Sequence, residues 1–268
     1  MVARELASVD GRVTATAEAV LPLPDDGLYR GDGVFEVIRL YGGRPFALGE
    51  HLDRLERSAA AIHLPADRAA IEGELAALLA EHGDGDAQLR IILTRAGRRI
   101  LLVEALAPRT DSAAVATVEY QPTVILNRVK SLSYGANMHA TRIAQERGAD
   151  EAVLVTPEGT VLEPPTSTIF WAAADGVLKT PSLENAILDS ITRDRLVAEI
   201  DVVEGTFEVA DLRGAAEAFL ASTTREIQPI SAIDGRALDW PGPRTREASR
   251  AFERIVSAGL GTTAGEPA

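Results

Sequence analysis

The chain of 268 residues contains no cysteine, and this absence excludes several kinds of chemistry. The chain can form no disulfide, has no thiolate nucleophile and offers no cysteine ligand to zinc. Its four histidines are His51, His63, His82 and His139. Their wide spacing does not indicate a zinc cluster. We therefore expect no metal site, and we expect any cofactor to be organic.

Basic charge and long apolar runs are also scarce. The formal net charge is −13 and the pI is near 4.8, whereas a protein that binds phosphate backbones or anionic lipid needs a basic surface. No segment approaches the roughly 20 apolar residues of a membrane-spanning helix. The start, Met-Val-Ala-Arg-Glu-Leu, lacks the layout of a signal peptide. We expect a cytoplasmic protein that binds neither nucleic acid nor membrane.

Lysine is nearly absent. Of the 27 lysines and arginines, only Lys130 and Lys179 are lysines, which leaves 27 − 2 = 25 arginines. A lysine amine can lose its proton and form an imine, whereas a guanidinium stays protonated. Lys130 opens the run Lys130-Ser-Leu-Ser-Tyr134 and is our candidate for covalent catalysis. The alternative is that an arginine-rich composition has left two lysines by chance.

Hydrophobic periodicity predicts strands and helices in both halves of the chain. In the first half it predicts hairpins over residues 34–48 and 89–105, and helices over residues 50–62 and 68–81. In the second half it predicts strands near residues 115–120, 151–156, 167–174, 219–222 and 228–233, and helices over residues 136–147, from residue 192 onward, and over residues 245–260.

The proline-bearing polar stretch of residues 108–114 is the predicted boundary between two lobes. We expect an α/β (α+β) fold with an N-terminal lobe of residues 1–110 and a C-terminal lobe of residues 111–268. Lys130 falls in the second of these lobes. The last residues, 261–268, are expected to be disordered.

Several short motifs follow one another along nearly the whole chain. They are Arg30-Gly-Asp-Gly-Val-Phe-Glu-Val-Ile-Arg39, His51-Leu-Asp-Arg-Leu55, Lys130 to Tyr134, Gly148-Ala-Asp-Glu-Ala152, Gly159-Thr-Val-Leu-Glu163, Ser190-Ile-Thr-Arg-Asp194 and Ser222-Thr-Thr-Arg-Glu-Ile227. In this order they resemble the class IV aminotransferases, the fold-type-IV pyridoxal phosphate (PLP) enzymes. That family includes branched-chain and D-amino acid aminotransferases and aminodeoxychorismate lyases. The resemblance implies a two-lobed fold, PLP in the cleft between the lobes, and a homodimer.

The resemblance also assigns residues to the cofactor ring. Lys130 matches the lysine that holds PLP as an imine and then moves a proton between the substrate and the cofactor. Glu163 matches the carboxylate that keeps the pyridine nitrogen protonated. Tyr134 matches the tyrosine at the phenolic oxygen, and Leu188 matches the leucine that packs on the ring. Without the family, Glu163 reads as a solvated residue at a strand end and Tyr134 as an amphipathic core residue.

The phosphate of PLP is expected at the start of a helix, where free backbone N–H groups and the helix dipole favour an anion. By resemblance, the amides of Ile191 and Thr192 bind it. Arg54 adds a charge-assisted contact and Thr223 adds a hydroxyl. Without the family, Arg54 would be an exposed helix arginine and Thr223 a residue of a polar turn.

Substrate contacts are implied for four residues: Phe35, Arg95, Arg98 and Thr224. Phe35 occupies a position that is phenylalanine in branched-chain enzymes and tends to be tyrosine in D-amino acid enzymes, so an apolar pocket wall is favoured. Arg95 and Arg98 cluster with Arg99 at a hairpin tip that can bind a substrate carboxylate in the family. An exposed arginine-rich hairpin is the equal alternative.

The chain also departs from the family pattern. Pro164 and Thr168 replace a glycine and an asparagine that usually follow the cofactor glutamate, and Ser190 replaces a common glycine at the phosphate turn. The arginine-x-histidine pair of the D-amino acid carboxylate trap is not evident after Gly97. These departures leave the substrate open.

We expect a PLP-dependent aminotransferase that moves an amino group between an amino acid, of the branched-chain or D-amino acid type, and a 2-oxo acid. The first alternative is aminodeoxychorismate lyase, but lyases of this kind carry a threonine where this chain has Val37. The Ser222-Thr-Thr224 run also looks more like a transaminase. The second alternative is a catalytically silent PLP-binding module, which the presence of Lys130 and Glu163 opposes.

Overall fold

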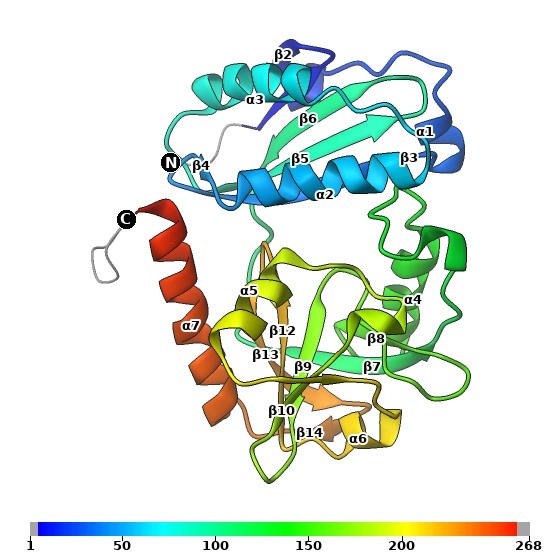
Figure 1. Ribbon diagram of the computed structural model, residues 1–268, viewed down its shortest axis with the longest axis vertical. Coiled ribbons are helices and arrows are strands. Elements are labelled where there is room, and N and C mark those ends of the chain that lie inside the picture. The colour runs from blue at the N-terminus through cyan, green and yellow to red at the C-terminus, as the bar shows by residue number, and fades with distance from the viewer. Residues whose placement is uncertain (1–4, 262–268) are drawn as a thin grey trace. The chain divides into compact units, whose positions relative to one another are not determined.

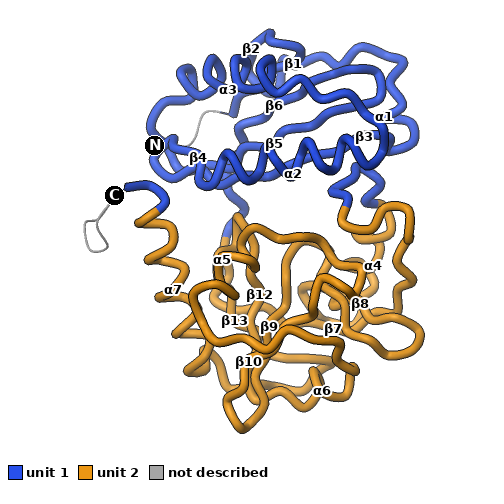
Figure 2. The backbone as a smooth tube through the Cα atoms, viewed as in Figure 1, with its two compact units in different colours: residues 1–108, 129–134, 259–268 blue, residues 109–128, 135–258 orange. Residues whose placement is uncertain are grey.

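The computed structural model describes residues 5–261, and the chain divides into two compact units (Figure 1, Figure 2). Unit 1 comprises Met1–Pro108, Val129–Tyr134 and Gly259–Ala268. Unit 2 comprises Arg109–Arg128 and Gly135–Ala258. Each unit has its own sheet and its own buried apolar core.

Unit 1 is built on an antiparallel sheet with the strand order β2-β1-β6-β5-β3-β4. Its strands are β1 (Leu6–Val9), β2 (Arg12–Ala15), β3 (Gly33–Tyr41), β4 (Arg44–Pro45), β5 (Ala87–Thr94) and β6 (Arg99–Glu104). Val34 and Ile38 of β3 belong to the apolar core. Because side chains alternate along a strand, Glu36 shares their face, and Phe35 and Val37 lie on the other.

Three α-helices of unit 1 contact this sheet: α1 (Asp26–Arg30), α2 (Leu48–Ala61) and α3 (Arg68–His82). Unit 1 also contains the 3-10 helix η1 (Thr16–Glu18). Helix α2 contacts β3 and buries Leu52 and Leu55 in the core. Helix α3 begins where the Asp67 side chain accepts a hydrogen bond from the Ala70 N–H at 3.1 Å, a favoured N-cap.

Unit 2 is built on a mixed sheet with the strand order β11-β10-β9-β12-β13-β7-β8, and β14 pairs with β13. Its strands are β7 (Ala113–Glu119), β8 (Glu151–Val155), β9 (Thr168–Ala172), β10 (Leu178–Pro181), β11 (Val203–Gly205), β12 (Glu217–Ser222), β13 (Glu226–Ile233) and β14 (Arg236–Ala237). The pairs β10–β11, β13–β7 and β7–β8 are parallel. The strands β8 and β9 are buried along their whole length, as parallel and central strands usually are.

The core of unit 2 includes two apolar clusters of described residues. The first includes Trp171, Leu220 and Ile230, and the second includes Ala144 and Leu154. The helices are η2 (Val124–Leu126), α4 (Gly135–Glu146), η3 (Leu183–Asn185), α5 (Ile191–Glu199), α6 (Val209–Arg213) and α7 (Pro243–Leu260). Helix α4 contacts β7 and β8, and α5 contacts β12. Helix α5 therefore lies on the sheet strand that ends just before Thr223.

Most of the elements predicted from periodicity are present, and two differences have clear causes. The first predicted hairpin ends early, because β4 has two residues and α2 already begins at Leu48. The β1–β2 hairpin was not predicted. Its turn is Asp10-Gly11, with φ of 52° and 88° at the two residues, and an Asp-Gly pair with positive φ is a strong hairpin signal.

The two units differ from the expected lobes in one respect. The first change of unit falls between residues 108 and 109, beside the expected boundary at residue 110, but Lys130 belongs to unit 1 rather than to the C-terminal lobe. The physical reason is backbone pairing with β3: the Phe35 N–H donates to the Lys130 carbonyl at 3.0 Å, and the Leu132 N–H donates to the Gly33 carbonyl at 2.9 Å. Disorder was expected for residues 261–268. Of these residues the structure describes only Gly261, so residues 262–268 lie outside the described part of the chain.

Candidate active site

Unit 1 contains a fully buried carboxylate, Glu36, in the middle of β3. Its Oε1 accepts a hydrogen bond from Arg54 Nε at 2.7 Å and its Oε2 accepts one from Arg54 Nη2 at 2.8 Å, which makes the ion pair bidentate. His51 Nδ1 lies 2.8 Å from the same Oε2. His51 and Arg54 are three residues apart on α2, so both reach the face of the helix that packs on β3.

These contacts determine the charges of the cluster. Burial opposes ionisation of Glu36, but the charge and hydrogen bonds of Arg54, followed by those of His51, outweigh burial and lower the pKa of Glu36 to about 2. Burial lowers the pKa of His51, and the positive charges of Arg54 and Lys130 act in the same direction against Glu36. At neutral pH, Glu36 is therefore ionised and His51 is neutral, with its Nδ1–H donated to the carboxylate.

Lys130 lies next to the same helix. Its backbone N–H donates to Ser58 Oγ at 3.2 Å, and its carbonyl accepts from the Phe35 N–H of β3. Ser58 follows Arg54 by four residues, which is about one helical turn. Arg54 and the backbone of Lys130 therefore lie along the same side of α2.

The Lys130 side chain extends over an aromatic pair. Its Nζ is 4.6 Å from the centroid of the Phe35 ring, a distance at which an ammonium is attracted to the ring face. The Phe35 ring meets the Tyr134 ring edge-on, with centroids 5.3 Å apart and an interplanar angle of 87°. Three residues selected from the sequence are thus in contact within unit 1.

The second lysine, Lys179 of β10, has different surroundings in unit 2. Its Nζ donates to Asp211 Oδ1 at 2.8 Å and to Oδ2 at 3.0 Å, and it lies 5.5 Å from the centroid of the Phe207 ring. Asp211 also accepts a hydrogen bond from Trp171 Nε1 at 3.1 Å. This ion pair gives Lys179 a structural role beside the core of unit 2.

The arginines of the β5–β6 hairpin are held by acidic partners inside unit 1. The pairs are Arg95–Asp32, Arg98–Asp10 and Arg99–Glu74, at 3.0, 2.8 and 2.7 Å. Arg95 also donates to the carbonyls of residues 62 and 63, each at 2.7 Å. These ion pairs tie the hairpin to neighbouring segments of unit 1, and the binding of a substrate carboxylate by Arg95 and Arg98 stays a prediction.

In unit 2, Glu163 contacts Leu188, the other residue of this unit that is predicted to lie at the ring. Its Oε1 accepts a hydrogen bond from the backbone N–H of Leu188 at 2.8 Å. Its carbonyl accepts from the Leu154 N–H of β8 at 3.2 Å. The side chain is partly exposed, so Glu163 presents a carboxylate at the surface of unit 2 next to Leu188.

Helix α5 begins three residues after Leu188. Ser190 is its N-cap, and the serine Oγ accepts a hydrogen bond from the Arg193 N–H at 3.3 Å. Serine is a favoured N-cap, so the replacement of the family's glycine has a structural use. The first N–H groups of a helix, here including those of Ile191 and Thr192, have no partner within the helix and lie at the positive end of its dipole. Anions bind to this arrangement.

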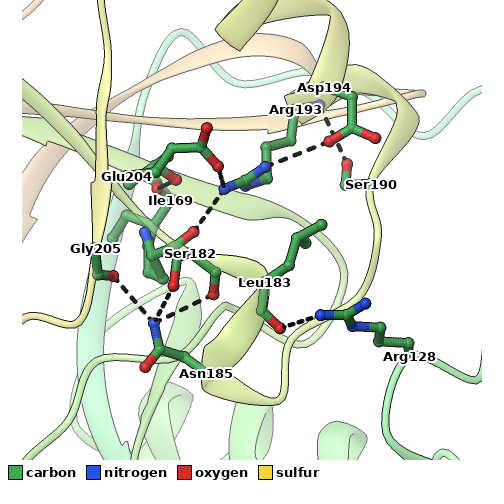
Figure 3. Close-up of polar contacts among 12 residues, drawn as sticks. Arg128, Ile169, Ser182, Leu183, Asn185, Ser190, Arg193, Asp194, Glu204 and Gly205 are labelled. Carbon is green, nitrogen blue, oxygen red and sulfur yellow. Dashed lines mark hydrogen bonds and ion pairs between the residues drawn. The ribbon is translucent and has the colours of Figure 1, made fainter.

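Arg193 anchors the first turn of α5 (Figure 3). Its side chain is only 2% exposed. The Nη2 group donates to the Pro181 carbonyl at 2.9 Å and pairs with Glu204, and Nη1 reaches Asp194 Oδ1 at 3.3 Å. Pro181 ends β10 and Glu204 lies in β11. The turn that carries Ile191 and Thr192 is therefore fixed to the parallel strands at the edge of the sheet.

Two carboxyl groups, those of Asp189 and Asp194, interact at this turn. Burial, followed by the hydrogen bond and negative charge of Asp189, raises the pKa of Asp194 to about 6, and Arg193 opposes the increase. The residues stand on either side of Ile191 and Thr192 in the sequence. The charge at the start of α5 therefore changes with pH near pH 6.

Thr223 and Thr224 lie in the turn between β12 and β13, and both are partly exposed. The next residue, Arg225, pairs with the buried Glu151 and donates to Thr166 Oγ1 at 3.4 Å. Thr166 belongs to the segment that follows Glu163. The turn with the two threonines is thus tied to the segment that carries the predicted cofactor carboxylate.

Four residues of these clusters were not selected from the sequence: Glu36, Ser58, Arg193 and, as a functional residue, His51. A signal was present for two of them. Glu36 is the only charged residue in the apolar run of residues 33–38, and His51 precedes Arg54 by three residues on a predicted helix. Ser58 accepts from a backbone N–H, and Arg193 contacts a backbone carbonyl and two carboxylates; periodicity indicates none of these contacts.

Each unit by itself carries part of the donor set that PLP needs. Unit 1 supplies an amine beside aromatic rings and a buried arginine, and unit 2 supplies a helix N-terminus and a carboxylate. Among residues 5–261, no group of three His, Asp or Glu side chains could hold a metal ion. The same residues include no helix with the length and apolar character needed to cross a membrane.

Comparison with known proteins gives one family. The sequence profile described as Amino-transferase class IV matches residues 33–233. The D-alanine aminotransferase of Listeria monocytogenes serotype 4b (strain F2365) is 34% identical over 286 residues, which cover 93% of this chain and 96% of that protein.

Solved structures show the same fold. A branched-chain aminotransferase from Thermoproteus uzoniensis, determined with norvaline, is 29% identical, covers 95% of this chain and 95% of its own, and superposes with a TM-score of 0.85. A fold IV transaminase from Curtobacterium pusillum is 28% identical, with coverage of 93% and 99% and a TM-score of 0.84. The predicted fold class is confirmed.

Proposed function

The chain belongs to the class IV aminotransferase family, whose members depend on PLP, and from this premise we propose that Lys130 holds the cofactor of an aminotransferase acting on an amino acid and a 2-oxo acid. The observation that carries the proposal is the environment of Lys130. Its Nζ lies over the Phe35 ring, and that ring contacts the Tyr134 ring. The Lys179 ammonium is instead bound by Asp211.

When bound, PLP withdraws electrons from the α-carbon of the amino acid joined to it. Lys130 would hold the cofactor covalently and, once released, would move a proton at that α-carbon. Tyr134 would donate a hydrogen bond to the phenolic oxygen. Glu163 would keep a proton on the pyridine nitrogen, because a nearby carboxylate favours the charged form, and Leu188 would pack on the ring.

The phosphate would be held by residues with complementary donors. The backbone N–H groups of Ile191 and Thr192 and the dipole of α5 would bind the anion. The Arg54 guanidinium and the Thr223 hydroxyl would add directed hydrogen bonds. The bidentate contact with Glu36 and the anchoring of α5 by Arg193 support these assignments.

The amino donor is of the branched-chain or D-amino acid type, with Phe35 as an apolar wall and Thr224 beside the substrate. Val37 shares the strand face of Phe35 and carries no hydroxyl. A lyase of this family would need a threonine hydroxyl at this position for proton transfer, and this chain has none there. Val37 therefore favours the aminotransferase over aminodeoxychorismate lyase.

A second copy of the chain is the proposed partner. Residues 20–29 of unit 1 expose large apolar side chains: Val20 is 76%, Leu23 63%, Leu28 59% and Tyr29 56% exposed. Large apolar side chains that are exposed so near one another in the sequence favour an interaction surface in this segment. Sedimentation of the parent protein is expected to give a dimer and that of Leu28→Asp more monomer. A parent protein that sediments only as monomer would contradict the dimer.

The two lysines provide the decisive test of the function. Lys130→Ala is expected to lose the visible absorbance of lysine-bound PLP and more than about 10² to 10⁴ of the rate, because both the covalent contact and the positioned proton transfer are removed. Lys179→Ala is the matched control and should keep both properties, apart from a loss of stability. Turnover by Lys130→Ala at a tenth of the parent rate would disprove the assignment.

A further inference from the structure

Glu36 is a charged residue at a position whose neighbours on the same strand face are apolar core residues. It lies between Val34 and Ile38 on the core side of β3, and its exposed fraction is 0%. Removing a carboxylate from water is expensive, and replacing a buried ion pair with apolar residues is often neutral or stabilising. Stability alone therefore does not explain a carboxylate at this position.

The contacts of Glu36 restrict the orientation of one side chain above all. Both carboxylate oxygens engage the Nε–Nη2 edge of Arg54, at 2.7 and 2.8 Å, and two parallel hydrogen bonds restrain the rotation of a planar guanidinium. His51 holds Oε2 from one turn earlier on α2, at 2.8 Å. The carboxylate is thereby held on two sides by residues of one helix.

This arrangement lies next to the lysine segment. Arg54 is one turn from Ser58, whose Oγ accepts the hydrogen bond from the Lys130 N–H. Charge is also balanced: Glu36 and Arg54 neutralise each other, and the lowered pKa of His51 keeps it neutral. An arginine neutralised in this way recognises a ligand by the direction of its N–H groups more than by net charge.

We propose that Glu36 is a positioning residue, whose carboxylate orients the Arg54 guanidinium toward the phosphate of the cofactor. The proposal rests on the assignment of Arg54 to the phosphate made above. Glu36 does not touch the cofactor, and its whole effect passes through Arg54.

The test compares PLP with pyridoxal, which has the same ring and aldehyde but no phosphate. The ratio of the two dissociation constants, measured by absorbance titration of the full chain, isolates recognition of the phosphate. In Glu36→Gln, one of the two carboxylate oxygens that accept from Arg54 is replaced by an amide N–H₂ group, which donates and cannot accept. The preference for PLP over pyridoxal is expected to fall roughly 10- to 150-fold, the range of a hydrogen bond to a charged group.

Glu74→Gln is the matched control. Glu74 is a poorly exposed carboxylate, 11%, that accepts from Nε of another arginine of unit 1, Arg99, at 2.8 Å. Its substitution should lower stability and leave the ratio unchanged. A purely structural role of Glu36 would weaken binding of PLP and pyridoxal equally, so an unchanged ratio in Glu36→Gln would overturn the proposal.

Two further variants complete the test. If Glu36 acts through Arg54, adding Glu36→Gln to Arg54→Met should change the ratio no further than Arg54→Met alone; independent effects that multiply would contradict the proposal. If Glu36→Gln does not fold, Glu36→Asp replaces it, since a shorter carboxylate cannot keep both contacts, and a parental ratio would again overturn the proposal. A parental ratio in Arg54→Met would instead remove Arg54 from the phosphate site, while Lys130→Ala tests the function itself.

Discussion

Arg54 in unit 1 and Arg193 in unit 2 are both nearly buried, but the fold uses them differently. Arg54 pairs with a carboxylate that is itself fully buried, so two charges are removed from water together. Arg193 donates to the Pro181 carbonyl, and its acidic partner Glu204 is 39% exposed. One unit holds a side chain in place, and the other holds a helix turn in place.

The difference follows from what each unit is proposed to present to the phosphate. In unit 1 the donor is a guanidinium, whose direction depends on another side chain. In unit 2 the donors are backbone N–H groups, whose directions are determined by α5 once its first turn is anchored. The orientation of the Arg54 guanidinium is sensitive to a change of one functional group. The orientation of the α5 backbone N–H groups is sensitive to loss of secondary-structure packing.

The largest expected effect on stability is at the buried pair. Arg54→Met leaves the Glu36 carboxylate buried without its cation, which costs about 3–5 kcal/mol. The double variant Arg54→Met with Glu36→Met should recover most of this loss. Chemical denaturation of both proteins and the parent provides the measurement. If Arg54→Met were as stable as the parent, water would have to reach the Glu36–Arg54 ion pair.

The corresponding change in unit 2 should have a smaller effect. Arg193→Met leaves the buried Pro181 carbonyl without this donor, which costs about 1–3 kcal/mol, while Glu204 can still be hydrated. Cofactor affinity should fall as well, because the turn of α5 loosens. Arg254→Met, which removes an exposed pair with Glu199, serves as the control and should change stability little. A larger loss in Arg193→Met than in Arg54→Met would reverse the comparison.

A further difference is that the first turn of α5 also depends on its N-cap, Ser190. Ser190→Ala removes the side-chain acceptor for the Arg193 N–H and is expected to cost about 0.5–2 kcal/mol. Ser190→Gly should cost only a few tenths, because glycine is tolerated at an N-cap. Thermal unfolding of the two variants measures the difference. Equal losses would mean that the hydroxyl contributes nothing to the helix.

The smallest effect concerns pH. The folded-state pKa of Asp194, about 6, is raised from 3.8, so the folded state binds more protons than the unfolded state between these values. Stability from this group is present below about pH 4 and is lost as the pH rises through 6. Asp194→Asn should therefore gain stability relative to the parent between pH 4 and pH 7.5.

The gain should stay below about 1 kcal/mol, because the Asp194 side chain is 49% exposed and screened by water. Glu253→Gln, which removes the same charge from an exposed position of α7, is the control. Denaturation curves at pH 4 and pH 7.5 measure both variants. An advantage of Asp194→Asn that is larger at pH 4 would contradict the direction of the shift.

The sequence predicted local structure well where local physics decides it. The helix expected over residues 68–81 is α3, between the Asp67 N-cap and Gly83, and the hairpin at residues 89–105 is β5–β6. Burial on both faces, which gives β9 its continuous apolar run, is also visible in the sequence. The candidate residues Lys130, Glu163 and Ile191 came from motif order, and their roles stay predictions.

The sequence by itself determined the lysine-poor and cysteine-free composition, the helix and strand periods and the motifs that identify the family, because these depend on residue type and short spacing. The tertiary structure decided which charges meet. It paired β3 with residues 129–134, which brings Lys130 to Phe35, and it enclosed Glu36 with Arg54. It also engaged Arg95 with Asp32. Such contacts join residues far apart in the chain, and only packing and backbone pairing bring them together.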